Sequence, residues 1–416
     1  MGTLSHETMD AAGEAAGRAP HDELTRVVRE HAAPLAASLV RLTGDFSAAE
    51  DLVQDAVVAA LRRWPRDGIP QRPDAWLFAV ARNRGVDAAR RAANYATKLA
   101  QLEQPVPPEP DERLRLIFTC CHPALTRAAQ IALTLRVVCG LTTAQIARAF
   151  LVPETTVAQR ITRAKRKIAD ARIPYRIPDA DELDARLDEV LAVIYLLLNE
   201  GYLSTAERAQ SRDLVDDAEW LASLLHTLMP NEPEVAGLLA LIRLHRARGD
   251  ARFGPDGGLV LLADQDRSRW DQGAIGAASQ LLARAITQGR PGPYQLQAAI
   301  VACHAEAKDW ASTDWEQIVV LYDMLHHLAP SPVVRLHRAI ALRYVAGPQA
   351  ALDELNGLAQ TDADTLDRYH LYHATQAELL RALGRPYQAR QADERALALT
   401  SNPAEQALLQ QRLDWS

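Results

Sequence analysis

The sequence predicts an all-α protein, and three observations support this fold class. Apolar residues recur at spacings of three and four, as in the series Leu187, Val190, Leu191, Ile194 and Leu198, which is typical of a helix with a buried face. Alanine and leucine, both strong helix formers, are abundant. Alternation of apolar and polar residues, which indicates a half-buried strand, is almost absent.

The composition is that of a soluble globular protein, with 48% hydrophobic and 24% charged residues in a chain of 416, long enough for about two to four domains. No apolar run approaches the roughly 18–20 residues of a membrane span. Residues 1–20 are acidic and lack the apolar stretch of a secretory signal, so we expect a disordered tail. The cysteines, Cys120, Cys121, Cys139 and Cys303, are too few for a disulfide framework and fit a reducing cytoplasm.

Proline-rich breaks divide the rest of the chain into three helical segments. The first covers 21–92, and a linker at 93–112 contains PVPPEP, in which closely spaced prolines cannot continue a helix. The second covers 113–175, and the third covers 176–416. Within the third, Gly347 and Gly384 begin similar stretches 37 residues apart, which predicts a tetratricopeptide-like pairing of helices at about 315–416.

Charge is distributed unevenly between these segments. Residues 113–172 hold eleven Arg and Lys against two acids, a net charge of +9, whereas residues 179–416 carry a net charge of −13. The overall charge of −7 therefore sums over unlike parts. A basic block of this kind is typical of a nucleic-acid binder.

Within the basic block, residues 144–168 predict a helix-turn-helix. Thr143 is expected to cap the first helix, 144–150, from which Ile146, Ala147 and Phe150 face the core. Pro153 leads into the second helix, whose inward side is Val157, Ile161, Ala164 and Ile168. A glycine is common in such turns but Leu151 stands here, so we expect a different turn geometry.

The outward side of the second helix carries the residue types that contact DNA in a major groove. Gln can pair with adenine, Arg with guanine, and Glu can accept from cytosine. The expected reading residues are Glu154, Thr155, Thr156, Gln159, Arg160, Arg163 and Arg166. The alternative is a solvated basic face on an ordinary packed helix.

The first segment predicts two amphipathic helices joined by a polar loop at 66–73. In 48–64 the expected apolar stripe is Leu52, Ala56, Val57 and Leu61, and Asp51, Gln54 and Asp55 project outward. In 75–91 tryptophan and aliphatic residues turn inward, and the outward residues are Arg82, Asn83, Asp87, Arg90 and Arg91. Basic residues beside tryptophans and a polar loop suit single-stranded DNA.

The motifs EDLVQDAVVAALRRW, WLFAVARNRGVDAARR and LTTAQIARAFLVPETTVAQRITRAKRKI together resemble bacterial sigma factors of the extracytoplasmic-function (ECF) class. The resemblance implies that 21–92 is region 2, which binds the polymerase clamp and melts the −10 element. It implies that 113–175 is region 4, which binds the β-flap and reads the −35 element. It implies no enzymatic activity.

The resemblance also assigns roles by position. Asp51, Gln54 and Asp55 match clamp-contacting positions, and the loop 66–73 matches one that captures a flipped base. The −10 positions are Arg82, Asn83, Asp87, Arg90 and Arg91. The −35 positions are those of the predicted reading helix.

Further motifs, including RLRLIFTCCHPAL, VLAVIYLLLNEGY, ADQDRSRWD and TDWEQIVVLYD, resemble a subgroup of these factors that carries a C-terminal tetratricopeptide-like extension. Asp256, Gly257, Gly258 and Leu259 match its Asp-Gly-Gly-Leu-like motif, so a regulatory role is implied for them. The extension could inhibit or activate, or could be a scaffold without a switch. The residues of NEGY and DQDRSRWD could equally be buried hydrogen-bonding groups at helix ends, with Trp270 in the core.

Metal and cofactor sites are not predicted. Adjacent Cys120 and Cys121 point about 100° apart on a helix, so they rarely share a metal, and packed thiols beside a helix-ending His122-Pro123 are the simpler interpretation. No phosphate-binding or catalytic motif is present. Two other functions remain open, a helix-turn-helix regulator with a helical sensing domain and a helical-repeat adaptor for protein partners.

Overall fold

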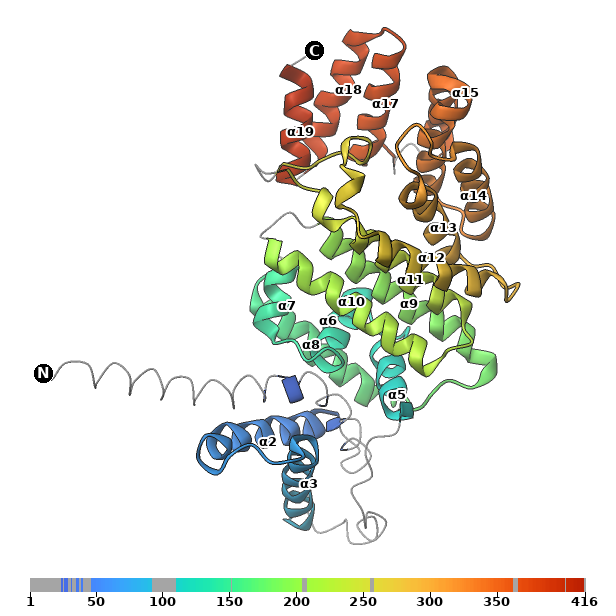
Figure 1. Cartoon of the computed structure of the whole chain (residues 1–416). Helices are drawn as coiled ribbons and strands as arrows, with labels where there is room; N and C mark the ends of the chain where they lie inside the picture. The colour runs from blue at the N-terminus through green and yellow to red at the C-terminus, as the bar shows by residue number, and fades with distance from the viewer. Residues whose placement is uncertain are drawn as a thin grey trace, which may run out of the picture. The chain divides into compact units, whose positions relative to one another are not determined.

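The computed structural model describes residues 24, 26–28, 31, 35–36, 39, 46–91, 110–150, 152–203, 208–254, 258–361, 366–400 and 402–414. Within these ranges the chain is helical, and its only β-type pairing is an isolated antiparallel bridge between Phe253 and Leu259 (Figure 1). The predicted all-α fold is confirmed. The chain divides into two compact units, residues 1–197 and 198–416, hereafter the N-terminal and C-terminal units. The predicted tail, 1–20, lies outside the described residues.

The N-terminal unit contains two groups of helices (Figure 1). α2 (Phe46–Asp67) packs on α3 (Pro73–Arg91). α5 (Pro110–Cys120), α6 (Arg127–Val137), α7 (Thr143–Ala149) and α8 (Glu154–Asp170) form the second group, in which α6 and α7 both pack on α8. α9 (Ala180–Leu203) begins in this unit and crosses the division at Leu197. Of the predicted linker, 93–109 lies outside the described residues.

The buried face of α2 differs from the predicted one. Its core residues are small except at the end: Ala49, Val53, Ala56, Ala60 and Trp64. Leu61 is 44% exposed, so its predicted place in the core is wrong. Alanines at three of the five positions allow α3 to approach closely. The prediction placed larger aliphatic residues in the core because apolar periodicity gives small residues little weight. Trp64 meets Trp76 of α3 edge to face, with ring centroids 5.7 Å apart.

The basic segment has a continuous apolar core beneath α8. Val157, Ile161, Ala164 and Ile168 are all buried, which confirms the predicted inward side. Ile146 and Ala147 of α7 are buried as predicted, whereas Phe150 is only half-buried. Leu151, at the predicted turn, lies outside the described residues.

The C-terminal unit is built from helical hairpins. Its helices are α10 (Arg208–Leu228), α11 (Pro233–Ala247), α12 (Gln272–Ile286), α13 (Pro293–Glu306), α14 (Trp315–Leu328), α15 (Pro332–Thr361), α17 (His370–Ala382), α18 (Pro386–Leu399) and α19 (Pro403–Asp414). α11 packs on α10, α12 and α13, α14 packs on α15, and α17 and α18 form the next pair (Figure 1). Three short 3₁₀ helices, Gly249–Ala251, Leu262–Asp264 and Arg267–Arg269, lie between α11 and α12.

Both glycines of the suspected repeat stand at bends. Gly347 interrupts α15 with φ 85° and ψ 168°, and Gly384 follows α17 with φ 71°. Left-handed backbone is accessible to glycine and costly for other residues. The structure therefore explains why glycine opens each stretch; the tetratricopeptide-like pairing over 315–416 stays a prediction.

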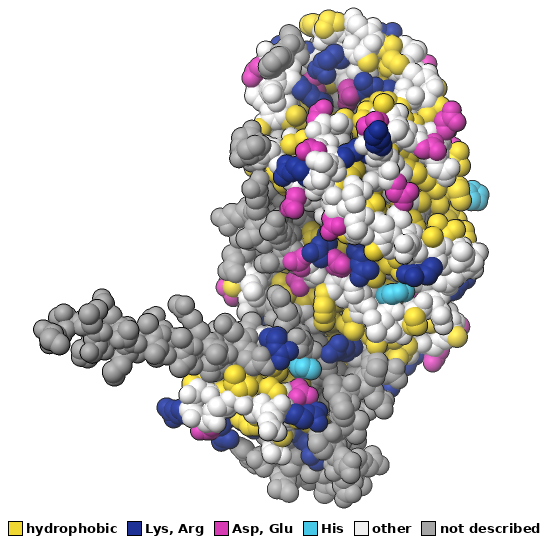
Figure 2. Space-filling model, viewed as in Figure 1, with side chains coloured by type: hydrophobic (Ala, Val, Ile, Leu, Met, Phe, Trp, Pro, Cys, Tyr) yellow, Lys and Arg dark blue, Asp and Glu magenta, His cyan; other side chains and the backbone are white. Residues whose placement is uncertain are grey.

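No described helix is long and apolar enough to cross a membrane. Figure 2 shows charged side chains of both signs over the C-terminal unit, with hydrophobic side chains gathered where α14 lies. On that helix Val320, Met324 and Leu328 are exposed at a spacing of four. The pattern is one apolar stripe along the outer side of α14.

Candidate nucleic-acid interface

The outward side of α8 presents most of the predicted reading residues to solvent. Glu154, Thr155, Gln159, Arg163 and Arg166 are exposed, whereas Thr156 and Arg160 are half-buried. The helix starts after Pro153, whose extended backbone (φ −59°, ψ 142°) serves as the N-cap without a side-chain bond. Because polar and basic groups occupy one side and the apolar stripe the other, the helix can lie on a duplex without exposing its core.

Side-chain hydrogen bonds fix the start of α7 and the turn before α8. The predicted cap of α7, Thr143, is wrong by one residue. Thr142, not Thr143, caps α7: its Oγ1 accepts from the backbone N–H of Gln145 at 3.2 Å, and Gln145 Oε1 accepts from the Thr142 N–H at 2.8 Å. This reciprocal pair is a capping box. The Thr143 hydroxyl instead donates to Glu154 Oε1 at 2.7 Å and joins the two helices of the motif. Adjacent threonines made the two positions indistinguishable by composition.

Lys165 differs from the exposed cations of α8 because its side chain lies in a largely buried ion pair. It pairs with Glu50 of α2, which also accepts from Arg136 Nε of α6 at 3.1 Å, and all three side chains are largely buried. By contrast, Arg166 faces Asp170 at 3.4 Å with both side chains mostly exposed. Sequence reasoning assigned no role to Glu50, Arg136 or Lys165. Their pairing joins helices far apart in the chain, and no local pattern could have indicated it.

The predicted clamp-contacting residues lie together on the surface of α2. Asp51, Gln54 and Asp55 are exposed. Asp55 Oδ2 accepts from Arg84 of α3 at 2.7 Å, with both side chains about half exposed. Such a pair contributes little to stability and is easily exchanged for another partner. Arg84 was not singled out from the sequence, although it follows Asn83 directly.

The predicted −10 residues are described only in part. On α3 the Arg82 side chain is half-buried and Asn83 is exposed. The side chains of Asp87, Arg90 and Arg91 lie outside the described residues, although their backbone is helical. The loop before α3 is shorter than the predicted 66–73, since α2 continues to Asp67 and α3 begins at Pro73. Gly68 turns the chain there with φ 82°.

The predicted regulatory motif lies at a short hairpin in the C-terminal unit. Gly254 N–H donates to Gly258 O at 2.9 Å, Val260 N–H donates to Arg252 O at 2.8 Å, and Leu259 bridges to Phe253. Asp256 and Gly257 lie outside the described residues. Gly258 is exposed and Leu259 half-buried. The regulatory role of the motif stays a prediction.

The neighbouring motif ADQDRSRWD is occupied by structural bonds. Arg267 Nη1 donates to the carbonyls of His304 and Ala307, each at 2.6 Å, at the end of α13, and its guanidinium lies 4.7 Å from the Trp270 ring. Trp270 is buried, and Asp271 caps α12 by accepting from Ala274 N–H at 2.9 Å. These contacts agree with the alternative interpretation, in which the motif residues are core and helix-end groups.

The cysteine pair is packed inside the basic segment. Cys120 and Cys121 are almost fully buried, and burial raises the pKa of the Cys121 thiol to about 11. His122 Nδ1 accepts from the backbone N–H of Ala124 at 3.1 Å, in the turn after α5. Among the described residues, no group of three or more His, Cys, Asp or Glu side chains is arranged to hold a metal ion. Both thiols are therefore packed as core residues.

Comparison with known families places two models on the N-terminal unit. Residues 27–95 match the model of sigma-70 region 2, and residues 115–168 match that of sigma-70 region 4. Residues 186–286 match a family of unknown function, DUF6596. The first model covers α2 and α3, and the second covers most of α5 to α8.

One relative matches most of the chain, and another matches about a third of it. An uncharacterised protein of Rhizobium meliloti (strain 1021) is 43% identical over 400 residues, which is 91% of this chain and 92% of that protein. The ECF RNA polymerase sigma factor SigL of Mycobacterium tuberculosis (strain H37Rv) is 36% identical over 147 residues, which is 33% of this chain and 82% of SigL. No solved structure matches the chain.

Both sigma-70 models match in chain order, and SigL is matched over most of its length. A family of promoter-binding initiation factors, not enzymes, accounts for the basic helix-turn-helix and for the absence of catalytic motifs in the sequence. The chain belongs to the extracytoplasmic-function RNA polymerase sigma factors and carries a C-terminal helical extension.

Proposed function

We propose that the protein binds core RNA polymerase at its clamp and β-flap and directs initiation at promoters with −10 and −35 elements. In this proposal Asp51, Gln54 and Asp55 contact the clamp. The α8 side chains read the −35 duplex, and α3 with the loop before it holds the −10 strand.

The observation that carries the proposal is the division of α8 into a buried apolar side and an outward basic and polar side. α6 and α7 pack on the buried side of α8. A helix held in this way can place its outward side chains in a major groove of DNA. Gln159 and Arg163, both exposed, suit adenine and guanine edges.

The C-terminal unit is proposed to modulate this activity without enzymatic chemistry, through protein partners that bind its helical hairpins. The pairing of residues 252–254 with 258–260, which includes Gly258 and Leu259 of the Asp-Gly-Gly-Leu-like motif, is the first place to test. If it regulates, Gly258→Val changes promoter output and leaves affinity for core polymerase unchanged, whereas a wild-type output makes the hairpin a structural loop.

An in vitro transcription assay with core polymerase and a genomic promoter library tests the function directly. The full-length protein is expected to select a set of promoters and start transcription at fixed sites. Tight duplex binding without any polymerase-dependent initiation would favour the helix-turn-helix regulator instead. Neither duplex binding nor initiation, together with protein partners of residues 176–416, would favour the adaptor.

A further inference from the structure

α9 has two apolar faces, and both are buried. At 100° per residue, Val190, Val193 and Leu197 lie within about 40° of Arg186 around the helix, and Glu189 lies about 60° from Arg186. A second stripe, formed by Leu187, Leu191, Ile194 and Leu198, is turned about 100° from the first. All seven aliphatic side chains are at most 5% exposed. A helix that is apolar on two sides is a packed element and not a solvated connector.

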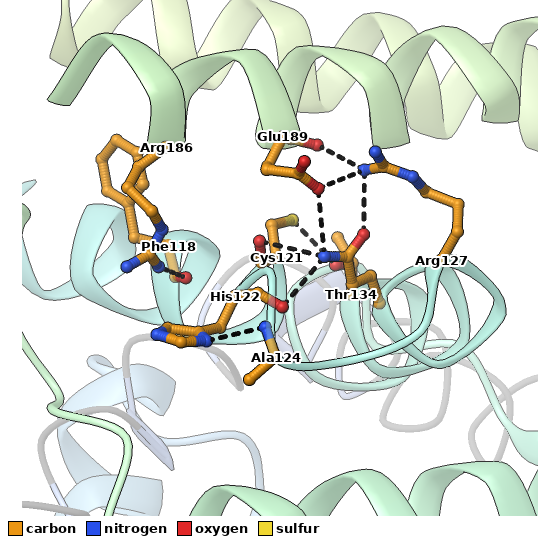
Figure 3. Close-up of polar contacts among 9 residues, drawn as sticks. Phe118, Cys121, His122, Ala124, Arg127, Thr134, Arg186 and Glu189 are labelled. Atoms are coloured by element: carbon orange, nitrogen blue, oxygen red, sulfur yellow. Dashed lines mark hydrogen bonds and ion pairs between the residues drawn. The ribbon is translucent and has the colours of Figure 1, made fainter. Parts of the chain in front are cut away.

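The Arg186–Glu189 side of α9 contacts region 4 where α5 turns into α6 (Figure 3). Glu189 Oε2 pairs with Arg127 Nη1 at 2.8 Å, and the backbone carbonyl of Glu189 accepts from the same nitrogen at 3.1 Å. Arg186 Nη2 donates to the Phe118 carbonyl at 2.5 Å, near the end of α5. A cation on the last carbonyls of a helix is favourably placed.

Gln130 of α6 lies at the centre of this contact. Its side chain is 1% exposed, and its amide nitrogen donates to the carbonyls of Cys121 and His122 at 3.2 and 2.9 Å. The same nitrogen lies 3.3 Å from Glu189 Oε2, and its amide oxygen accepts from Arg127 at 2.9 Å. Cys121 Sγ in turn lies 3.5 Å from the Thr134 hydroxyl. A buried network of this kind is costly to leave half satisfied.

We propose that α9 is a clasp through which the C-terminal extension acts on region 4: Arg186 and Glu189 hold the α5–α6 corner and thereby position α8 on the −35 element. The path is short. Glu189 fixes Arg127 and Gln130 in the first turn of α6, and α6 packs directly on α8. The proposal rests on the proposed promoter function for its DNA readout, but the clasp itself is defined by contacts within the N-terminal unit.

The contact between α9 and the α5–α6 turn combines a buried amide with a partly exposed ion pair, an arrangement that allows the ion pair to open. Gln130 is buried, but the Arg127 and Glu189 side chains keep 37% and 29% of their surface exposed. Water can therefore replace the ion pair at modest cost, since half-exposed pairs contribute little net free energy. When the ion pair opens, Gln130 and Cys121 are expected to become more accessible to solvent, so the accessibility of Cys121 measures the state of the contact.

Glu189→Ala in the full-length chain tests the clasp, with Asp188→Ala as the matched control. Both changes remove one negative charge from the same helix and favour helix formation. Asp188 is exposed and lies near the acids Asp184 and Glu189, so its removal relieves repulsion. Two quantities are measured: affinity for −35 promoter DNA, and the rate at which a maleimide labels the 120–121 cysteine pair, located by peptide mass spectrometry.

We expect Glu189→Ala to weaken −35 binding by about 2- to 30-fold, the range of couplings carried through packed elements. Labelling of the buried cysteines is expected to accelerate about tenfold, because local opening limits it. Asp188→Ala should leave both quantities at wild-type values. Arg127→Ala combined with Glu189→Ala should be no worse than the more severe single change, since both act through one contact.

Equal behaviour of Glu189→Ala and Asp188→Ala would overturn the proposal, and so would tighter −35 binding by Glu189→Ala, because the contact would then be a brake. Glu189→Gln, which keeps the side-chain volume, covers the case in which the alanine variant does not fold, and the same direction of change is expected. Labelling is measured without polymerase, so it remains decisive even if the protein directs no initiation.

Discussion

The cations of α8 have unlike surroundings, and this decides what each can do. Lys165 is committed to Glu50, and Arg166 faces Asp170. Within the described part of the chain, neither Arg160 nor Arg163 has an ion-pair partner. An arginine without a carboxylate partner keeps its planar donor set for a guanine edge.

Replacement of Arg160 or Arg163 by Ala is expected to weaken use of the −35 element by about 1–3 kcal/mol if that residue makes a bidentate base contact. The loss should depend on the base at one position, since a base contact carries sequence information. Transcription from promoters substituted singly through the −35 element measures it. Unchanged preference in both variants contradicts the assignment of α8.

Lys167→Ala is the matched comparison, because Lys167 is exposed in the last turn of α8. A lysine that contacts phosphate should, when removed, weaken all promoters about equally and reduce the salt dependence of binding by about one unit of slope. A promoter-specific effect of Lys167→Ala would place the reading surface further along the helix than proposed.

At the scale of elements, the glycine bends of the C-terminal unit have a cost that can be measured. Gly347 and Gly384 adopt positive φ, and a Cβ at either position would meet nothing within 4 Å. Only the backbone conformation therefore opposes a side chain. Gly347→Ala and Gly384→Ala are each expected to lower the free energy of unfolding by about 1–2 kcal/mol in urea titrations followed by circular dichroism.

Gly357 provides the opposite case on α15. It lies inside the helix with an ordinary backbone conformation and open space around its Cβ position. Gly357→Ala should raise the free energy of unfolding by about 0.5–1 kcal/mol, because alanine loses less backbone entropy on folding. A similar loss in all three variants would show that crowding, and not φ, determines their effect.

The sequence predicts those features of the helices that depend only on residues close together in the chain. The inward side of α8 follows from four aliphatic positions at helical spacing, and all four are buried. Glycine bends and proline breaks are equally local. The Thr142 cap was not predicted because Thr143 stands next to it and has the same side chain. The exposure of Leu61 was not predicted because α2 packs its alanine face, and not its larger aliphatic residues, against α3. The contacts of Glu50 and Glu189 depend on distant segments that no periodicity brings together.

At the scale of the molecule, each of the two compact units contains buried hydrophobic residues. The N-terminal core includes Ile161, and one cluster of the C-terminal unit is centred on Leu355 and Leu358. Units with their own cores can unfold as separate transitions. We expect two transitions in scanning calorimetry of the full-length protein.

Core truncations assign these transitions. Ile161→Ala and Leu355→Ala each remove buried aliphatic volume and should cost about 2–5 kcal/mol. Ile161→Ala is expected to lower only one transition temperature and Leu355→Ala only the other. A single transition that shifts in both variants would mean that the whole chain unfolds as one cooperative body.

The contact between α11 and α13 limits how the C-terminal unit can deform. A Cβ at Gly237 would lie 2.7 Å from Gln295 Cγ and 2.8 Å from its backbone nitrogen. Gln295 is itself held by Glu234, whose Oε1 accepts from both its backbone and its side-chain nitrogen at 3.0 Å. Helices this close can neither slide nor rotate past each other without a steric clash. We therefore expect slow internal motions of the unit to leave this pair intact and to hinge at places such as Gly347, where the helical backbone is already interrupted.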